Sequence, residues 1–234
     1  MVSVEKAVIA KLKQNGETFE VLVDCEKAMA FKEGKSISMD DVLAVSEVFS
    51  DAKKGLAASE KRMEAVFGTA DPYEVAKIII KEGEVQLTAA YREKLRERVK
   101  KQIIDILHRN GIDPRTNAPH PPARLEAALE EAKVKIDETK PASEQVERIL
   151  KQIRPILPIR FAKKEIAIKI KSDYAGKAYP FVQKSGKILK QEWQNDGSLI
   201  AVVEIPGGIE EEFYDQLNKI THGTVETKLL KVHE

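Results

Sequence analysis

The sequence predicts an α+β protein made of three domains, and three observations carry that prediction. The chain has 234 residues, more than one small domain needs. Its apolar residues alternate with polar ones in the first part, recur at three- and four-residue steps from Thr88, and alternate again after Pro158. Junctions at Gly83–Thr88 and Pro155–Pro158 separate these patterns, so we expect domains over residues 1–86, 87–160 and 161–234, hinged at both junctions.

Residues 1–86 combine strand and helix signals. The segments Val4–Leu12 and Thr18–Val23 flank Asn15-Gly16, which is typical of a hairpin turn. Alternation in the first strand places Lys11 and Lys13 on the face opposite Ala10. The other expected elements are helices over Glu26–Lys32 and Ser59–Phe67, a helix start at Asp40-Asp41, a strand over Val45–Phe49, and a helix that Asp71 caps ahead of Pro72. This is an α+β domain.

Residues 87–160 predict three amphipathic helices with short links. We expect Thr88 to cap the first helix and Asn110-Gly111 to end it with a left-handed residue. The apolar faces are Tyr91, Leu95, Val99, Ile103 and Leu107 in the first helix, Leu125, Leu129, Ala132 and Ile136 in the second, and Val146, Ile149, Leu150 and Ile153 in the third. Four prolines stiffen the connector Asp113–Pro122, and the domain is expected to be a three-helix bundle.

Residues 161–234 predict the order βαββαβ. Ile166, Ile168 and Ile170 mark a strand, and Asp173 is expected to cap a helix that contains Pro180 and ends at Gly186. The strands Lys187–Trp193 and Leu199–Ile205 are expected to pair across Asn195-Asp196-Gly197, and a helix with Phe213, Leu217 and Ile220 precedes a last strand over Val225–Val232. This order predicts a ferredoxin-like domain.

Composition and charge narrow the class of protein. No stretch approaches the roughly 20 apolar residues of a membrane helix, so we expect a cytoplasmic protein with no membrane association. Cys25 is the one cysteine, which excludes a disulfide framework. The net charge of +1 is unevenly spread: residues 1–86 hold 12 basic and 16 acidic side chains, residues 87–160 hold 16 and 11, and residues 161–234 hold 11 of each. The middle domain, at +5, is the basic one.

No residue pattern predicts catalysis. Gly186-Lys187 suggests a phosphate-binding loop, but Phe181 stands where that motif needs a glycine and Ile188 where it needs Ser or Thr. The four histidines do not have metal-ligand spacing. The outward positions of the first and third strands of the last domain lack aromatic residues, which excludes an RNA-recognition-motif platform, and Trp193 fits a sheet residue. We expect no catalytic residue, no metal and no cofactor.

Two groups of basic residues suit phosphates. Arg92, Arg96 and Lys100 step by four along the first bundle helix, although a solvated face balanced by Glu93 and Glu97 is the competing interpretation. In the first domain Lys53-Lys54-Gly55 forms a basic turn whose glycine lets a backbone approach, with Lys11 and Lys13 nearby. Together the two groups favour RNA over an acidic protein by a small margin.

Several phrases together resemble the SBDS (Shwachman-Bodian-Diamond syndrome) family of ribosome-maturation proteins, in its archaeal form, across essentially the whole chain. They are Ala7–Lys13, Phe19-Glu20-Val21, Glu47-Val48-Phe49, Lys53-Lys54-Gly55, Phe67-Gly68-Thr69, Ile79–Lys81, Glu82-Gly83-Glu84-Val85-Gln86 and the connector Ile112–Pro122. Where eukaryotic members carry basic residues after the Lys-Gly turn and in the connector, this chain has Ser59 and Ala118.

The resemblance implies a monomeric, non-enzymatic factor of ribosome biogenesis. Similar proteins bind the rRNA of the large ribosomal subunit through the first domain. Their later domains face a translocase-type elongation-factor GTPase, which releases the ribosomal anti-association initiation factor; contact with that factor is indirect. The residues expected to bind RNA are Lys11, Lys13, Lys53, Lys54, Arg92, Arg96, Lys100 and Arg115. The alternatives are a general RNA-binding accessory protein of RNA processing, associated with the exosome, and an enzyme with an unrecognised site.

The connector carries two competing interpretations. Its prolines fit a structural brace, whereas Arg115, Asn117 and His120 are polar and expected to be exposed on a rigid loop, as binding residues often are. We predict that the prolines brace the loop and that Arg115 contacts a partner.

Overall fold

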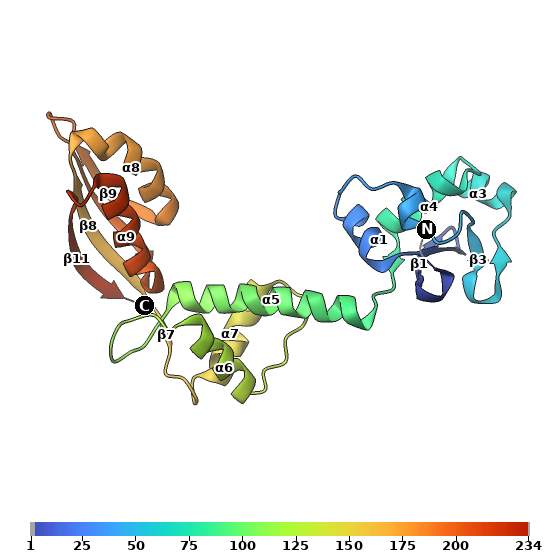
Figure 1. Ribbon diagram of the computed structural model, residues 1–234, viewed down its shortest axis with the longest axis horizontal. Helices are drawn as coiled ribbons and strands as arrows, with labels where there is room; N and C mark the ends of the chain where they lie inside the picture. The colour runs from blue at the N-terminus through green and yellow to red at the C-terminus, as the bar shows by residue number, and fades with distance from the viewer. Residues whose placement is uncertain (1–2, 234) are drawn as a thin grey trace. The chain divides into compact units, whose positions relative to one another are not determined.

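The computed structural model describes residues 3–233 and divides into two compact units, one as far as Leu95 and one from Arg96 onward (Figure 1). The division falls within the long helix α5 (Ala89–Asn110). The first unit contains the predicted α+β domain and residues 87–95 of the predicted helical domain. The second unit contains the rest of that helical domain and the predicted third domain.

The first unit is a fully antiparallel sheet with helices packed against it. The five-stranded sheet has the order β4-β3-β2-β1-β5 and consists of β1 (Val8–Gln14), β2 (Glu17–Val23), β3 (Phe49–Asp51), β4 (Leu56–Ala57) and β5 (Glu84–Val85). The helices are α1 (Cys25–Lys32), α2 (Met39–Val42), α3 (Glu60–Phe67) and α4 (Pro72–Glu82), with short 3-10 turns η1 (Val4–Lys6) and η2 (Ala52–Lys54). Asn15 and Gly16 have φ of 51° and 83°, the left-handed values that a tight hairpin turn requires.

The core of this unit lies between the sheet and α4. Ala10 and Val21 from the hairpin and Ile79 and Ile80 from α4 are all fully buried, while the side chains of alternate hairpin residues face away from the core. The strand predicted over Val45–Phe49 is wrong in its bounds. The ladder with β2 starts only at Phe49, because the preceding residues bend after an isolated bridge between Val23 and Leu43.

The first half of the second unit is a set of three helices around an apolar core. They are α5, α6 (Pro122–Glu131) and α7 (Ala142–Ile153), and Thr88 Oγ1 accepts the Tyr91 N–H at the start of α5, as predicted. A two-stranded sheet joins β6 (Gly111–Ile112) to β7 (Arg160–Phe161). The predicted left-handed stop is wrong, since Gly111 begins β6. Its glycine is needed because a Cβ there would lie 2.5 Å from Ile159 Cδ1.

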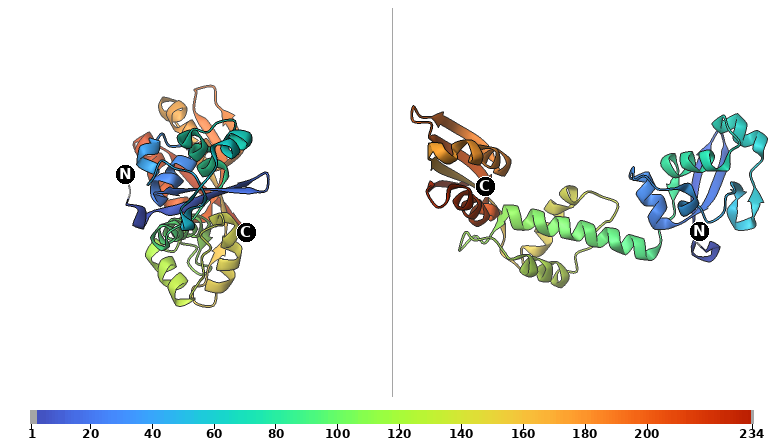
Figure 2. Two further views of the ribbon diagram at one scale, coloured as in Figure 1. Left: turned by 90° about the vertical axis from the view of Figure 1, so that its right-hand side faces the viewer. Right: turned by 45° about the horizontal axis from the view of Figure 1, so that its top comes forward.

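The second half contains an antiparallel sheet of order β11-β8-β10-β9. Its elements follow as β8 (Lys163–Ile170), α8 (Ser172–Ser185), β9 (Lys187–Trp193), β10 (Leu199–Pro206), the 3-10 turn η3 (Gly207–Ile209), α9 (Glu210–Thr221) and β11 (Glu226–His233). Both helices lie on one side of the sheet (Figures 1 and 2). Helix α8 begins at Ser172 with no side-chain cap, so the predicted Asp173 cap is wrong, and it continues through Pro180.

The two halves of the second unit are joined by close backbone contacts. The Ala162 N–H donates to Asn110 O at 3.1 Å, and Gly208 packs so tightly on α5 that a Cβ there would lie 1.9 Å from His108 O. His120 is buried and donates from Nε2 to Pro158 O at 2.8 Å. These bonds lie on both sides of Pro155–Pro158, within one compact unit, and the hinge predicted there stays a prediction.

Candidate nucleic-acid interface

The first group of candidate residues lies on the open face of the β1–β2 hairpin. Lys11 and Lys13 are exposed on the face opposite Ala10, as alternation predicts. The register places Lys11 between Glu20 of β2 and Glu84 of β5, and Lys13 opposite Thr18. Within the described residues neither lysine forms an ion pair, so both ammonium groups remain in contact with solvent.

The basic turn is anchored to the same hairpin. The Ala52 N–H donates to Glu20 Oε2 at 2.8 Å, which ties η2 to β2. Gly55 ends the turn with φ of 64°, where a glycine avoids strain. Asp51 accepts the Lys54 N–H at 3.1 Å, and its second oxygen lies 3.1 Å from Lys54 Nζ. These bonds with Lys54 lower the pKa of the Asp51 carboxyl group. Both lysines are exposed, but Lys54 is paired with Asp51 within the turn, whereas Lys53 forms no ion pair with a described residue.

A groove of about 470 Å³ brings Lys11 and Lys53 together. Its lining consists of Ile9, Lys11, Thr18, Glu20, Ser50, Asp51, Lys53, Glu84 and Gln86. The groove exists because β3 pairs with β2 and thereby places the basic turn beside the hairpin. Lys13 and Lys54 are not part of the lining. The acidic side chains in the groove restrict phosphate contact to the tips of Lys11 and Lys53, because a phosphate deeper inside would be repelled.

The second group, on α5, is largely engaged within the protein. Arg96 pairs with Glu138 at 3.4 Å, and Lys100 lies 2.8 Å from Glu126 and 3.1 Å from Glu130, with 16% of its side chain exposed. The carboxylate of Glu126 raises the pKa of Lys100, burial lowers it and Glu130 raises it, so the pKa lies above its ordinary value. Acidic residues on α6 and in the loop after it thus neutralise Arg96 and Lys100. Arg92, in the first unit, is exposed and contacts Leu87 O at 3.4 Å.

The connector is braced by bonds to both halves of the second unit. Asp113 is buried, and the Arg115 N–H that it accepts at 2.8 Å lowers its pKa. Asn117 adopts φ of 54° and accepts from Arg160 at 3.0 Å. His108 Nδ1 donates to His120 O at 2.8 Å. The expectation that His120 is exposed is wrong, because its imidazole is 2% exposed and holds the loop.

Arg115 is one of five consecutive exposed residues in the connector, 114–118, and the only one of them with a charged side chain. Its side chain is 79% exposed, and its closest charged neighbour is Asp113, 3.8 Å from Nε. A rigid loop with a projecting guanidinium group suits recognition of a phosphate or carboxylate.

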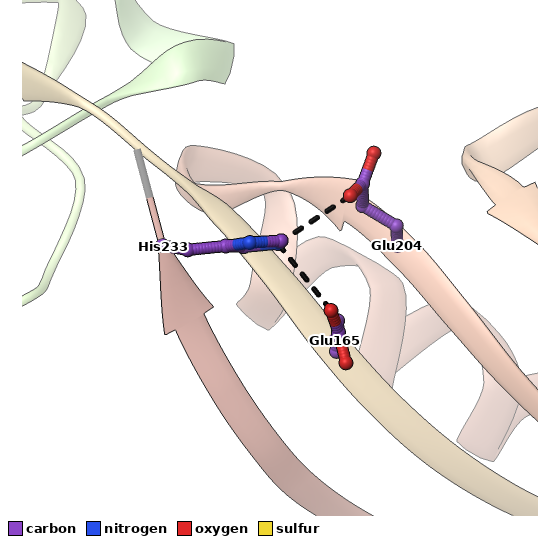
Figure 3. Close-up of side chains that lie close together, drawn as sticks. All are labelled: Glu165, Glu204 and His233. Atoms are coloured by element: carbon purple, nitrogen blue, oxygen red, sulfur yellow. Dashed lines mark ion pairs between the residues drawn. The ribbon is translucent and has the colours of Figure 1, made fainter. Parts of the chain in front are cut away.

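Two charged clusters were missed from the sequence. Lys164 is buried on β8, where its ammonium group donates to Asn117 O at 3.0 Å and pairs with Glu210. His233 lies 3.6 Å from Glu165 and 3.4 Å from Glu204 on adjacent strands (Figure 3). The donor set of one imidazole and two carboxylates suits a metal, yet Lys163 Nζ already lies 3.0 Å from Glu204 and lowers its pKa. We interpret this cluster as ion pairing.

Three known domain families match consecutive parts of the chain. They are the Shwachman-Bodian-Diamond syndrome (SBDS) N-terminal domain over residues 6–93, SBDS protein domain II over residues 101–162 and the SBDS protein C-terminal domain over residues 164–232. In the described chain no helix combines the length and apolar character needed to span a membrane.

Full-length relatives agree with these domain matches. A "Ribosome maturation protein SDO1 homolog" of Methanothermobacter thermautotrophicus is 51% identical over 99% of this chain and 100% of its own length. One of Aeropyrum pernix with the same name is 39% identical over 96% and 97%. A "Ribosome maturation protein SBDS" of Caenorhabditis elegans is 26% identical over 95% and 89%. The chain belongs to the SBDS protein family, whose named relatives support a role in ribosome maturation.

Proposed function

We propose that this protein is a non-enzymatic, cytoplasmic maturation factor that binds the rRNA of the large ribosomal subunit as a monomer. In this proposal the second unit, with its ferredoxin-like last domain, faces a translocase-type GTPase, which then releases the anti-association initiation factor. The observation that carries the RNA contact is the groove in which Lys11 and Lys53 approach each other without ion pairs in the described part of the chain. The ribosomal setting is supported by the names of the relatives.

The groove is suited to a phosphate backbone more than to bases. Its cations are lysines, which act as point charges, and its lining contains no aromatic side chain on which a base would stack. The domain binds in spite of its net charge of −4 because the contact is local, and the acidic side chains of the lining limit it to the rim.

Sedimentation of the tagged full-length chain with purified large subunits tests this proposal. The variant Lys11→Glu/Lys53→Glu should weaken binding and reduce the log–log salt slope by about one unit for each phosphate that the protein no longer neutralises. A matched control, Lys35→Glu/Lys61→Glu, changes the net charge equally at exposed positions outside the groove. Lys54→Glu should have a smaller effect than Lys53→Glu, since Lys54 is paired with Asp51.

Three results would count against the proposal. Equal weakening in the groove variant and the control would show that only net charge matters. An unchanged salt slope would remove the phosphate contact. Migration of the protein with an RNA-processing complex and not with large subunits would favour the exosome-associated alternative.

A further inference from the structure

The two edge strands of the C-terminal sheet carry the same short pattern. Strand β9 contains Lys187-Ile188-Leu189-Lys190, and β11 contains Lys228-Leu229-Leu230-Lys231. In a regular strand, residues three apart face opposite sides of the sheet. Both strands, however, have a register shift at the leucine before the second lysine, where β9 skips Leu189 and β11 skips Leu230. A bulge of this kind returns the second lysine to the side of the first.

Cross-strand register shows which side that is. Lys190 lies opposite Val202 of β10, and Lys228 lies opposite Ala167 of β8. Val202 and Ala167 are themselves paired, and they alternate with buried residues that face α8 and α9. The next row likewise places Lys187 opposite Glu204 and Lys231 opposite Glu165. All four lysines therefore lie on the helix-free face, two along each edge.

The four edge lysines are accessible to an acidic partner. All four edge lysines are exposed, and none forms an ion pair with a described residue. Lys187 lies opposite Glu204 and contributes, after Lys163, to the lowered pKa of that carboxyl group. Of the two carboxylates between them, Glu204 is paired with Lys163 at 3.0 Å, and His233 Nε2 lies 3.6 Å from Glu165 and 3.4 Å from Glu204.

Between the two edges the floor is apolar where Ala167 and Val202 lie. The row beyond them holds Ile200, which is 38% exposed, beside Lys169, with Glu192 and Glu226 at the two edges.

We propose that this face docks an amphipathic α-helix of a partner protein, with an apolar seam flanked on both sides by acidic residues. The two edge strands are three strand spacings apart, about 14 Å, and an α-helix with its side chains is about 10–12 Å wide. Such a helix fits over Ala167 and Val202 and reaches Lys190 and Lys228 with its flanking carboxylates. RNA fits less well, because the floor has no aromatic side chain on which a base would stack.

Edge protection is the competing explanation. Lysines and bulges on edge strands also prevent sheet edges from pairing between molecules. That role does not require both lysines of each strand to share one face, nor a pair of rows around an apolar floor. The two explanations differ in whether the face binds a helix.

Fluorescence anisotropy with the full-length chain tests the proposal. The probe is a fluorescein-labelled 18-residue peptide, capped at both ends, with a leucine seam flanked by glutamates; a scrambled peptide of the same composition is the reference. The peptide should bind, and Lys190→Glu/Lys228→Glu should weaken it at least tenfold. Val202→Glu should also weaken it by placing a charge on the floor. Lys177→Glu/Lys219→Glu, exposed on the helix side, should stay within twofold of the unmodified chain.

The results of this experiment distinguish a helical peptide, an RNA and no ligand at this face. Equal binding of the scrambled peptide, or equal weakening in both double variants, would reduce the effect to net charge and overturn the proposal. No binding of either peptide would leave edge protection as the role of the lysines and also overturn it. Binding of a 20-nucleotide oligouridylate that needs Lys190 and Lys228, with no peptide binding, would identify a nucleic-acid surface instead. Circular dichroism checks that each variant is folded.

Discussion

Lys164 connects the two halves of the second unit, and its removal should be costly. The side chain is 2% exposed, donates to Asn117 O in the connector and pairs with Glu210 at the start of α9. We predict that Lys164→Met, which keeps the aliphatic stem, destabilises the second unit. The charged hydrogen bond that this variant removes contributes about 1.5–3 kcal/mol. Glu210 would also be left without its cation.

The cost of leaving Glu210 without its cation depends on the surroundings of its carboxylate. Breaking a buried ion pair costs about 3–5 kcal/mol in all. Glu210 is 20% exposed and keeps the Tyr214 hydroxyl at 3.1 Å, so part of its solvation remains. We therefore expect a total near the lower limit, about 3 kcal/mol, or a fall in Tm of roughly 6–12 °C for a unit of this size.

The fluorescence of Trp193 can measure the loss of stability in Lys164→Met. It is the single tryptophan and lies on β9, so its fluorescence in a urea titration reports unfolding of the second unit. Lys164→Met/Glu210→Gln should recover at least about 1 kcal/mol, because no carboxylate is then stranded. A change of less than about 0.5 kcal/mol in the single variant, or no recovery in the double variant, would refute the reasoning.

Three further variants examine the connector and its junction. Arg115→Ala should leave stability within about 0.5 kcal/mol but weaken large-subunit binding; a lower Tm with unaltered binding would contradict this. Asp113→Asn should destabilise at pH 7. Because the folded pKa of Asp113 is lowered, that difference should shrink once pH falls below about 4 and disappear as pH passes below the folded pKa; a constant difference would argue against it. Gly208→Ala should cost about 1–3 kcal/mol through its clash with His108 O, and a neutral effect in urea would disprove that contact.

Local structure was predictable where a residue type alone decides it. Asn15-Gly16 and Gly197 adopt the left-handed values that their turns require, and Asp71 caps α4 through the Tyr73 N–H. The alternation of Ile166 with polar neighbours correctly marked β8. In each case the determining interaction lies within a few residues of the chain.

The predictions failed where a distant partner decides the outcome. His120 was expected to be exposed, but Pro158 O, 38 residues away, holds its ring. Lys164 stands at an inward position in the same alternation as Ile166, which was a visible signal, yet its partners Asn117 and Glu210 are 47 and 46 residues away. The strand pairing that brings Lys53 beside Lys11 has no local signature either.

The edge-strand lysines show that the sequence alone does not reveal strand register, which decides the face on which a side chain lies. By period alone, Lys187 and Lys190 point to opposite sides of β9, and so do Lys228 and Lys231 on β11. The bulges at Leu189 and Leu230 reverse that conclusion, and neither leucine announces a bulge in the sequence. A sequence argument about which charges share a face therefore needs the pairing partner of each strand.

The bonds around Lys164 also bear on how the second unit works. Arg115 is carried by a connector that Lys164 of β8 holds through Asn117 O, and Lys164 thereby links Arg115 to the sheet that carries the edge lysines. A partner that contacts both would meet two preorganised sites and lose little conformational entropy in doing so. Lys164→Met should consequently weaken binding of such a partner even at temperatures where the second unit stays folded. Arg115→Ala, in contrast, should weaken it without loosening the junction.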